Sequence, residues 1–199
     1  MIIGICGFQS SGKDSIASFL VNNYGFKQLS FASALKDIVS IIFNWPRNKL
    51  DGLTLEDRLW REEIDVYWAK TYNIPCLTPR YVLQYFATDL FRKHFHEDIW
   101  VNIIETTLNK YKNIVISDCR FINEINMITK NGGQLLHVHR NLPEWFNRYK
   151  NGEYVEEINN IHCSETQWIR CNFNYEINNN GTIDELNKKI SLLMSEILE

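Results

Sequence analysis

Apolar runs and helical patterns alternate over the first forty residues of the chain. Met1 to Cys6 is a short apolar run that ends at Gly7, and a pattern with apolar residues on one helical face begins at about Lys13. A second apolar segment, Lys27–Ala32, precedes another helical pattern from Ala34 to Phe43. This order predicts a strand, a glycine-rich turn, a helix, a second strand and a second helix, as in a βαβ unit.

The same alternation returns in the second half of the chain. Asn113–Ser117 has the continuous β-branched character of a buried parallel strand, and Gln134–His139 follows after a helix that Gly132 and Gly133 close. Phe173–Ile177 is predicted as a fifth strand, and a terminal helix is expected from Asp184 to Leu198. The chain therefore predicts an α/β fold with a five-stranded, mostly parallel sheet, helices on both faces, and ligands at the carboxyl ends of its strands.

Two segments are too long for simple crossovers between strands. We expect residues 45–105 to be a helical insertion that binds an acceptor, and residues 141–172 to form a lid. With 199 residues, the chain is predicted to be a single domain, 1–199, that carries both segments.

Composition and charge narrow the classes of function. Hydrophobic residues make up 45% of the chain and charged residues 23%, which is typical of a globular domain. The net charge of −3 gives no general basic surface, so binding to a nucleic-acid polymer is not expected. No apolar run approaches the ~18 residues of a membrane helix, and the five scattered cysteines are typical of reduced thiols. We expect a cytoplasmic protein without membrane contact.

A phosphate-binding motif follows the first predicted strand. Gly7 to Lys13 matches Gly-x4-Gly-Lys between a strand and a helix, where glycines let the backbone wrap around phosphate oxygens. Lys13, expected to be exposed, would add positive charge at the donor phosphates. Magnesium would be held by Asp14 or Ser15, because Asp14 stands where Ser or Thr is usual. The predicted phosphate-binding residues are Gly7, Gln9, Ser10, Ser11, Gly12, Lys13, Asp14 and Ser15.

A second candidate lies at the end of the predicted strand Asn113–Ser117. Asp118 at a strand end beside a phosphate loop is suited to orient magnesium or its water, and Arg120 would face the transferring phosphoryl group. Alternatively, Asp118 is a helix N-cap and Arg120 a surface residue, since strand–Asp–helix junctions are common.

The segment Thr78–Phe95 predicts a helix with Thr78 as its N-cap and Pro79 in its first turn. Arg80, Gln84 and Thr88 recur at four-residue spacing, so that a guanidinium, an amide and a hydroxyl can clamp a phosphate and a base edge. A solvated helix face would produce the same spacing. Lys36 can hold an acceptor phosphate or extend into solvent, and Trp100 can line a base pocket or belong to the core.

The chain resembles the deoxynucleoside monophosphate kinases of tailed phages and related viral enzymes. The matching motifs, which span most of the chain, are Gly-x4-Gly-Lys-Asp-Ser at Gly7–Ser15, Phe-Ala-x-x-Leu-Lys at Phe31–Lys36, Arg-x3-Gln-x3-Thr-Asp-Leu at Arg80–Leu90, Asp98 with Trp100-Val101, Ser-Asp-x-Arg at Ser117–Arg120, and His-x-Ser-Glu at His162–Glu165. The resemblance implies a P-loop kinase core that uses ATP and Mg²⁺ to phosphorylate deoxynucleoside monophosphates to diphosphates, for dNTP supply. Related kinases can form homodimers.

Site residues carried over by this resemblance fall into three groups. Lys13 and the loop amides would bind the ATP phosphates, and Ser15 and Asp118 would serve the metal. The acceptor site would be lined by Lys36, Arg80, Gln84, Asp89 and Arg120, to which Thr88, Trp100 and Asp118 are added as candidates. Arg148 is the candidate lid arginine that acts in catalysis with Lys13 and Arg120, and Arg140 and Arg170 are alternatives.

Two rival functions share the phosphate loop. Phosphomevalonate kinases resemble this chain in Gly-Lys-Asp and Ser-Asp-x-Arg, so a P-loop kinase for another phosphorylated small molecule is the first alternative. A non-catalytic ATP-binding switch is the second alternative, and it predicts ATP binding without dependence on an acceptor.

Overall fold

The computed structural model describes residues 1–198, which form two compact units. The sheet unit consists of Met1–Ser30 and the chain from Ile104 onward, and the helical unit is Phe31–Ile103. The helical unit contains most of the predicted insertion 45–105 but begins earlier, because α2 also packs within it.

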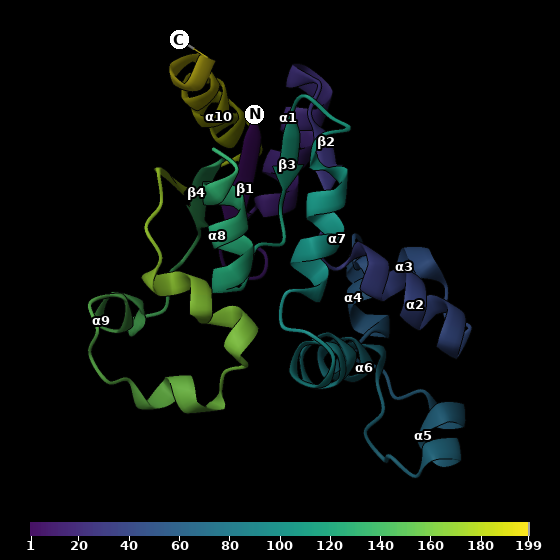
Figure 1. The fold of residues 1–199 in the computed structure, drawn as a ribbon. Helices are drawn as coiled ribbons and strands as arrows, with labels where there is room; N and C mark the ends of the chain where they lie inside the picture. The colour runs from purple at the N-terminus through teal and green to yellow at the C-terminus, as the bar shows by residue number, and fades with distance from the viewer. Residues whose placement is uncertain (199) are drawn as a thin grey trace. The chain divides into compact units, whose positions relative to one another are not determined.

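The sheet unit contains one sheet of five parallel strands (Figure 1). Their order is β2-β3-β1-β4-β5, which confirms the predicted α/β class. The strands are β1 (Ile2–Cys6), β2 (Lys27–Leu29), β3 (Ile114–Ile116), β4 (Gln134–His139) and β5 (Tyr175–Asn178). β1 and β3 are buried at every position, which is typical of parallel strands covered on both faces.

Both faces of the sheet carry helices. One face packs on α1 (Lys13–Tyr24) and α10 (Ile183–Leu198), which contribute Leu20 and Ile190 to the core. The other face packs on α8 (Ile122–Lys130), whose Ile128 lies so close to Gly4 of β1 that a Cβ there would be 2.5 Å from its Cδ1. The smaller helices are α9 (Phe146–Lys150), η2 (Glu156–Asn160), η3 (Cys163–Glu165) and η4 (Gln167–Arg170).

The strand order brings three chain segments to one edge of the sheet. β1 lies between β3 and β4, with Gly4 paired to Ile116 and Cys6 paired to His137. In a parallel sheet the carboxyl ends of all strands lie at the same edge. Ligands bind at this edge, at the switch point where the connections from neighbouring strands run to opposite faces of the sheet. The loop after β1 therefore lies beside the ends of β3 and β4.

Two strand boundaries differ from the predicted ones. β2 ends at Leu29 and does not reach Ala32, because Ser30 leaves the edge of the sheet and donates a hydrogen bond to Asp118. β5 begins at Tyr175 and not at Phe173, whose ring packs against the buried His137 and Trp168. Apolar character alone did not separate a strand residue from a core residue next to a strand.

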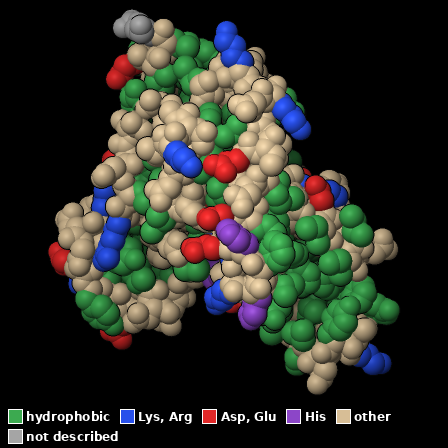
Figure 2. Space-filling view, viewed as in Figure 1, with side chains coloured by type: hydrophobic (Ala, Val, Ile, Leu, Met, Phe, Trp, Pro, Cys, Tyr) green, Lys and Arg blue, Asp and Glu red, His purple; other side chains and the backbone are tan. Residues whose placement is uncertain are grey.

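The helical unit is built from short helices around an aromatic core. Its helices are α2 (Ser33–Phe43), α3 (Arg47–Asp51), α4 (Leu55–Trp60), α5 (Val66–Tyr72), α6 (Pro79–Gln84), the π-helical η1 (Tyr85–Arg92), and α7 (Ile99–Leu108), which continues into the sheet unit. Phe43 stacks on Trp45 at 4.5 Å and contacts Trp68 edge-on at 5.3 Å. Hydrophobic side chains also gather on the surface of this unit, including Leu53, Leu55 and Val66 (Figure 2). Among residues 1–198, no helix combines the length and the apolar character that crossing a bilayer requires.

The predicted helix Thr78–Phe95 is present, but its geometry changes midway. Thr78 caps α6 by accepting a hydrogen bond from the Tyr81 amide at 3.1 Å, as predicted. From Tyr85 the helix widens into η1, inside which the carbonyl of Ala87 accepts a hydrogen bond from the Trp100 indole at 3.2 Å. A side-chain donor that takes a helix carbonyl competes with the regular ladder, and the local winding widens there.

An aromatic cluster of the sheet unit encloses a histidine. The ring of His137 on β4 is fully buried, stacks on Phe146 at 5.6 Å, and lies 5.2 Å from both Trp168 and Phe173. Neither ring nitrogen has a hydrogen-bond partner among the described residues, although a Glu176 carboxylate oxygen lies 3.7 Å from Nδ1. Burial lowers the pKa of His137 to about 4, so its ring is neutral in the folded protein near pH 7.

This burial makes the stability of the protein depend on pH in a defined window. Between pH 6.5 and about 4, the unfolded chain takes up a proton at His137 and the folded chain does not, so stability falls as the pH falls. The expected total loss is about 3 kcal/mol. Urea unfolding at several pH values measures it, and His137→Phe, which keeps a ring without a titrating group, should flatten the curve in this window.

The exposed His94 supplies the control for this measurement. His94→Gln should leave the pH dependence between 6.5 and 4 as it is in the wild type. Equal slopes for the wild type and His137→Phe would contradict the assignment.

Candidate active site

The loop between β1 and α1 has the backbone of an anion-binding turn. Gly7, Ser10 and Gly12 have φ values of +152°, +62° and +106°, and Gly12 is the N-cap of α1. No side chain in the described part of the chain caps α1. The first amide groups of the helix are therefore left for a ligand, and the helix dipole favours an anion there.

Glycine is required at Gly7 for two reasons. Its φ lies in the region that residues with a side chain rarely adopt, and a Cβ would lie 2.2 Å from the backbone oxygen of Val138 on β4. The loop thus curls directly against the neighbouring strand. Ser11, whose Oγ is buried and lacks a hydrogen-bond partner among the described residues, lies 2.8 Å from that same Cβ position.

Two residues that sequence reasoning missed hold this loop in place. The buried Asn179, which follows β5, donates a hydrogen bond from Nδ2 to the Ser11 carbonyl at 2.9 Å. The ring of Phe8 contacts Trp145, Phe146 and Trp168 edge-on, with centroids 5.1 to 5.9 Å away. Asn179 lies in an asparagine run and Phe8 at a variable position of the motif, so neither had a local signal.

Lys13 lies inside the loop, and the expectation that it is exposed is wrong. Its side chain is buried, and Nζ donates hydrogen bonds to the carbonyls of Gly7 at 2.9 Å and Phe8 at 2.7 Å. The loop closes over the lysine because these two carbonyls satisfy its ammonium group. Burial, followed by the nearby charge of Arg120, lowers the pKa of Lys13 to about 8.

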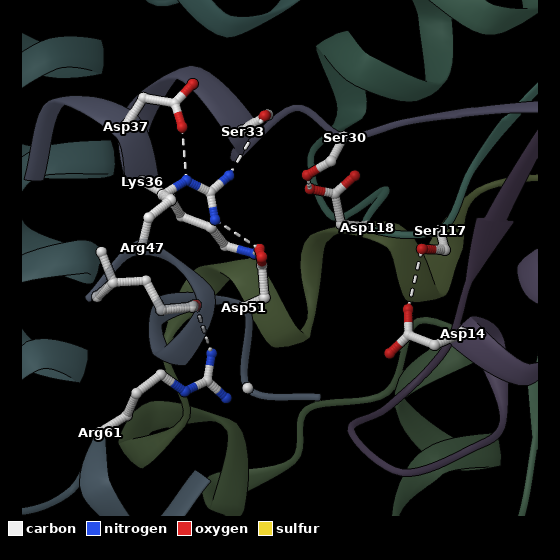
Figure 3. Close-up of polar contacts among 12 residues, drawn as sticks. Asp14, Ser30, Ser33, Lys36, Asp37, Arg47, Asp51, Arg61, Ser117 and Asp118 are labelled. Atoms are coloured by element: carbon white, nitrogen blue, oxygen red, sulfur yellow. Dashed lines mark hydrogen bonds and ion pairs between the residues drawn. The ribbon is translucent and has the colours of Figure 1, made fainter. Parts of the chain in front are cut away.

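Two carboxylates of the sheet unit are held by serine hydroxyls (Figure 3). Ser117 Oγ donates to Asp14 Oδ1 at 3.0 Å, and Ser30 Oγ donates to Asp118 Oδ2 at 2.7 Å. Gln28 on β2 orients Ser117 by donating to its hydroxyl at 3.1 Å. The start of α1 and the ends of β2 and β3 thus position the two acids.

Asp118 is not the N-cap of the following helix. α8 begins at Ile122 after Phe121, and the buried carboxylate of Glu124 accepts the amides of Arg120 and Phe121 at 2.7 and 3.0 Å. Glu124 thus accepts the backbone amides of the turn before α8. The Asp118 carboxylate instead accepts a hydrogen bond from Ser30 at the end of β2.

The oxygen donors at this edge fit a magnesium ion. Asp14, Ser15 and Asp118 offer carboxylate and hydroxyl oxygens, the ligand type that Mg²⁺ prefers. Within residues 1–198, no group of three or more His, Cys, Asp or Glu side chains is arranged to hold a metal. A magnesium ion in a kinase needs one or two carboxylates and completes its shell with water and substrate phosphate.

Arg120 pairs with a carboxylate from the predicted lid. Its guanidinium contacts Glu165 of η3, and both side chains are about one-third or less exposed. Arg120 and Glu165 also lie near Lys13, since both charges act on its titration. Of the candidate catalytic residues, the structure therefore brings Lys13 and Arg120 together.

The three candidate lid arginines are engaged elsewhere or exposed. Arg148 at the end of α9 pairs with Glu153 at 3.2 Å, with 56% of its side chain exposed. Arg170 lies 4.1 Å from the centre of the Tyr149 ring and donates to the Tyr149 carbonyl at 2.9 Å. Arg140 is exposed. Arg148 thus lies on the surface of the described protein.

The candidate acceptor residues Lys36, Arg80, Gln84, Thr88, Asp89 and Trp100 belong to the helical unit. Lys36 and the Arg47 guanidinium both point toward Asp51, with Asp51 Oδ1 3.0 Å from Lys36 Nζ and 2.8 Å from Arg47 Nη1 (Figure 3). Although burial acts to raise it, Arg47 and Lys36 hold the pKa of Asp51 below its ordinary value. Sequence reasoning missed Arg47, which contacts Ser33 and Asp37 of α2 and Asp51 of α3.

The other candidates of this unit differ in exposure. Arg80 is partly buried and pairs with Glu62, and Asp89 pairs with Lys93. Thr88 and Trp100 are buried, and the Trp100 ring lies 5.2 Å from Phe91. Trp100 therefore belongs to the core of the helical unit, as one of the two interpretations expected.

A parallel sheet of this order, with a Gly-x4-Gly-Lys loop between its central strand and first helix, defines a P-loop kinase core. Residues 62–190 match the family model of deoxynucleotide monophosphate kinase. A protein of Acanthamoeba polyphaga mimivirus that is itself assigned as a deoxynucleotide monophosphate kinase is 33% identical over 153 residues, which are 70% of this chain and 74% of that protein. The chain belongs to the deoxynucleotide monophosphate kinase family and is a phosphotransferase that acts on deoxynucleotide monophosphates.

Solved kinase structures show a more distant likeness. Shikimate kinase from Aquifex aeolicus is 17% identical with a TM-score of 0.44, covering 100% of this chain and 98% of that chain. Dephospho-CoA kinase from Campylobacter jejuni is 13% identical with a TM-score of 0.48, covering 98% and 96%. The fold is defined by the strand order and the phosphate loop of this chain itself.

The contact between Gly7 and β4 leads to a stability prediction. Gly7→Ala should destabilise the protein by about 3 kcal/mol, because the new Cβ meets a backbone oxygen in addition to the strained φ. Gly25→Ala is the matched control, since Gly25 also has a positive φ but nothing lies within 4 Å of its Cβ position. That control should cost about 1 kcal/mol. Urea unfolding of both variants compares them, and equal losses would show that the loop does not press on β4.

Proposed function

We propose that this protein transfers the γ-phosphoryl group of ATP to deoxynucleoside monophosphates, forming deoxynucleoside diphosphates for dNTP supply. Membership of the family supports the acceptor class. The observation that supports ATP as the phosphoryl donor is the loop itself. Glycines with positive φ, the uncapped amides of α1 and Lys13 all come together there. Such an arrangement is suited to the phosphates of a nucleoside triphosphate.

On the donor side, the loop amides bind phosphate oxygens and Lys13 exchanges partners. The Lys13 ammonium group gives up the carbonyls of Gly7 and Phe8 and donates to the phosphates, a stronger charge-assisted interaction. A bound polyanion also offsets the repulsion between Lys13 and Arg120. Gln9, Ser10 and Ser11 contribute through the loop that they form, and within residues 1–198 the Ser11 hydroxyl has no hydrogen-bond partner to lose.

The proposed magnesium ligands are the carboxylate of Asp14 or Asp118 and the hydroxyl of Ser15. When bound, the ion would neutralise phosphate charge and align the donor. The serine hydroxyls of Ser30 and Ser117 keep the two carboxylates oriented before any ligand arrives.

On the acceptor side, we propose Lys36, Arg80 and Gln84 as the residues that bind the monophosphate, with Thr88 and Asp89 supporting η1. Each cation is held by a carboxylate, Asp51 for Lys36 and Glu62 for Arg80. An acceptor phosphate would take the place of a carboxylate that is already paired with the cation. Binding therefore removes little additional water from the cation. Trp100 acts from the core by holding the Ala87 carbonyl of η1.

Transfer to a phosphate oxygen needs no general base, because the acceptor is already anionic. It needs alignment and compensation of negative charge instead. Lys13 and Arg120 supply that compensation from the sheet unit. Arg148 would add to it only if the segment 141–172 moved as a lid, as the sequence predicts.

A coupled ADP-release assay with ATP and magnesium tests this proposal. It compares dTMP, dGMP, dCMP and dAMP with their ribose counterparts and with phosphomevalonate. The deoxynucleotides should give acceptor-dependent turnover. Lys13→Met, which keeps the buried stem and removes the charge, should reduce kcat/KM by about 10³-fold with an unchanged circular dichroism spectrum.

Two results would redirect the assignment. Turnover with phosphomevalonate alone would indicate a kinase for another small molecule. ATP binding without turnover on any acceptor would indicate a switch protein.

The acceptor residues are tested by separating the two KM values. Arg80→Ala and Gln84→Ala should raise the KM for the deoxynucleotide, by roughly 10- to 100-fold for the arginine, because a charge-assisted hydrogen bond is lost. The KM for ATP should change little. The control is Lys70→Ala, which removes an exposed lysine of α5 and should leave both values unchanged. Unchanged acceptor kinetics in both variants would place these side chains on an ordinary solvated face.

A further inference from the structure

Glu165 stands on a turn that is fixed to the core of the sheet unit. It ends η3, where His162 caps the turn by accepting a hydrogen bond from the Ser164 amide at 3.3 Å. The next turn, η4, buries Trp168 and Ile169 almost completely. Trp168 in turn contacts Phe8 of the phosphate loop at 5.1 Å. The backbone that carries Glu165 is therefore packed against the same loop that surrounds Lys13.

Arg120 is held from two directions. The buried carboxylate of Glu124 accepts its backbone amide at 2.7 Å, and Glu165 accepts its guanidinium. Glu124 thus fixes where the side chain starts, and Glu165 fixes where it ends. The Arg120 and Glu165 side chains are 32% and 25% exposed, so this pair is screened less by solvent than a surface pair.

The charges around Lys13 explain why such a partner is needed. Trp168, just after Glu165, packs on Phe8, and the Phe8 carbonyl accepts a hydrogen bond from Lys13 Nζ at 2.7 Å, so the backbone that carries the partner of Arg120 is packed on the loop that encloses Lys13. Two cations close together repel each other when no phosphate is bound. A carboxylate that pairs with one of them offsets this repulsion and keeps the guanidinium near the lysine.

We propose that Glu165 is a positioning residue, which holds the Arg120 guanidinium beside Lys13 and so sets the geometry of phosphoryl transfer. The inference rests on the proposed function. It gives the segment 141–172 a role other than supplying an arginine, since Arg148 pairs with Glu153 and Arg170 stacks on Tyr149.

Arg120 can serve the phosphate without leaving Glu165. A guanidinium has five N–H donors, and a carboxylate occupies one edge of the planar group. The remaining donors stay available for the transferring phosphoryl group, in an orientation that Glu165 sets. The carboxylate therefore remains bound during the reaction, whereas the carbonyls on Lys13 are replaced.

Kinetics of Glu165→Gln test this role. Losing the charge should lower kcat by about tenfold or more, while the KM for ATP changes less than about threefold. Glu165→Asp keeps the charge on a shorter side chain and should restore part of kcat. Glu153→Gln removes the carboxylate that pairs with Arg148 in the same segment, and it should behave as the wild type.

A second measurement uses the protein without nucleotide. In ¹⁵N NMR spectra of the arginine side chains, a paired guanidinium shows slow rotation about its Cζ–Nη bonds. The Arg120 signals, assigned through Arg120→Lys, should show this restriction in the wild type and Glu153→Gln and lose it in Glu165→Gln. Urea unfolding shows whether Glu165→Gln is still folded. Glu165→Asp, which keeps the charge, is the second variant that separates the loss of the ion pair from a loss of folding.

Each outcome decides between the alternatives. Unchanged kcat, or unchanged Arg120 rotation despite a lower kcat, would overturn the positioning role of Glu165. A wild-type protein without transferase activity would overturn the proposed function, and the NMR comparison would still report whether Glu165 holds Arg120.

Discussion

A positive charge enclosed by backbone is the constraint on which the site depends. Lys13 lies within the loop that it serves, and two carbonyls of that loop are the groups that satisfy it. Removing an ammonium group from water is costly unless polar partners replace the water. The loop must therefore curl over the lysine, which requires a glycine at Gly7 where it meets β4. The same backbone turn exposes the amides of α1 to an anion.

Carboxylates act as internal counterions in both units. Lys36 and Arg47 share Asp51, Arg80 has Glu62, and Arg120 has Glu165. Cations that lie close together repel one another in the free protein, so each needs an anion that can share or give up its place. The pairs are only partly buried, and the cost of exchanging one anion for another is correspondingly small. The cations are thus held in place by their carboxylates without being bound tightly to them.

The sequence predicted the features that depend on neighbouring residues. Five parallel strands, the loop before Lys13 and the Thr78 cap followed from local hydrophobic periodicity and capping chemistry. It could not predict the burial of Lys13, because a loop lysine is exposed unless the loop backbone curls so that its own carbonyls enclose the ammonium group. The contact between Phe8 and Trp168 and the pair of Arg120 with Glu165 join residues far apart in the chain, and no local pattern marks such partners.

The hydrogen bond from Asn179 to the Ser11 carbonyl has a consequence for the order of folding. It joins residues 168 positions apart, so the loop that contains Ser11 is completed by a segment that is synthesised much later. Contacts of such separation form late, because the entropy of closing the intervening chain must be overcome first. During translation the loop would thus stay incomplete until β5 has joined the sheet.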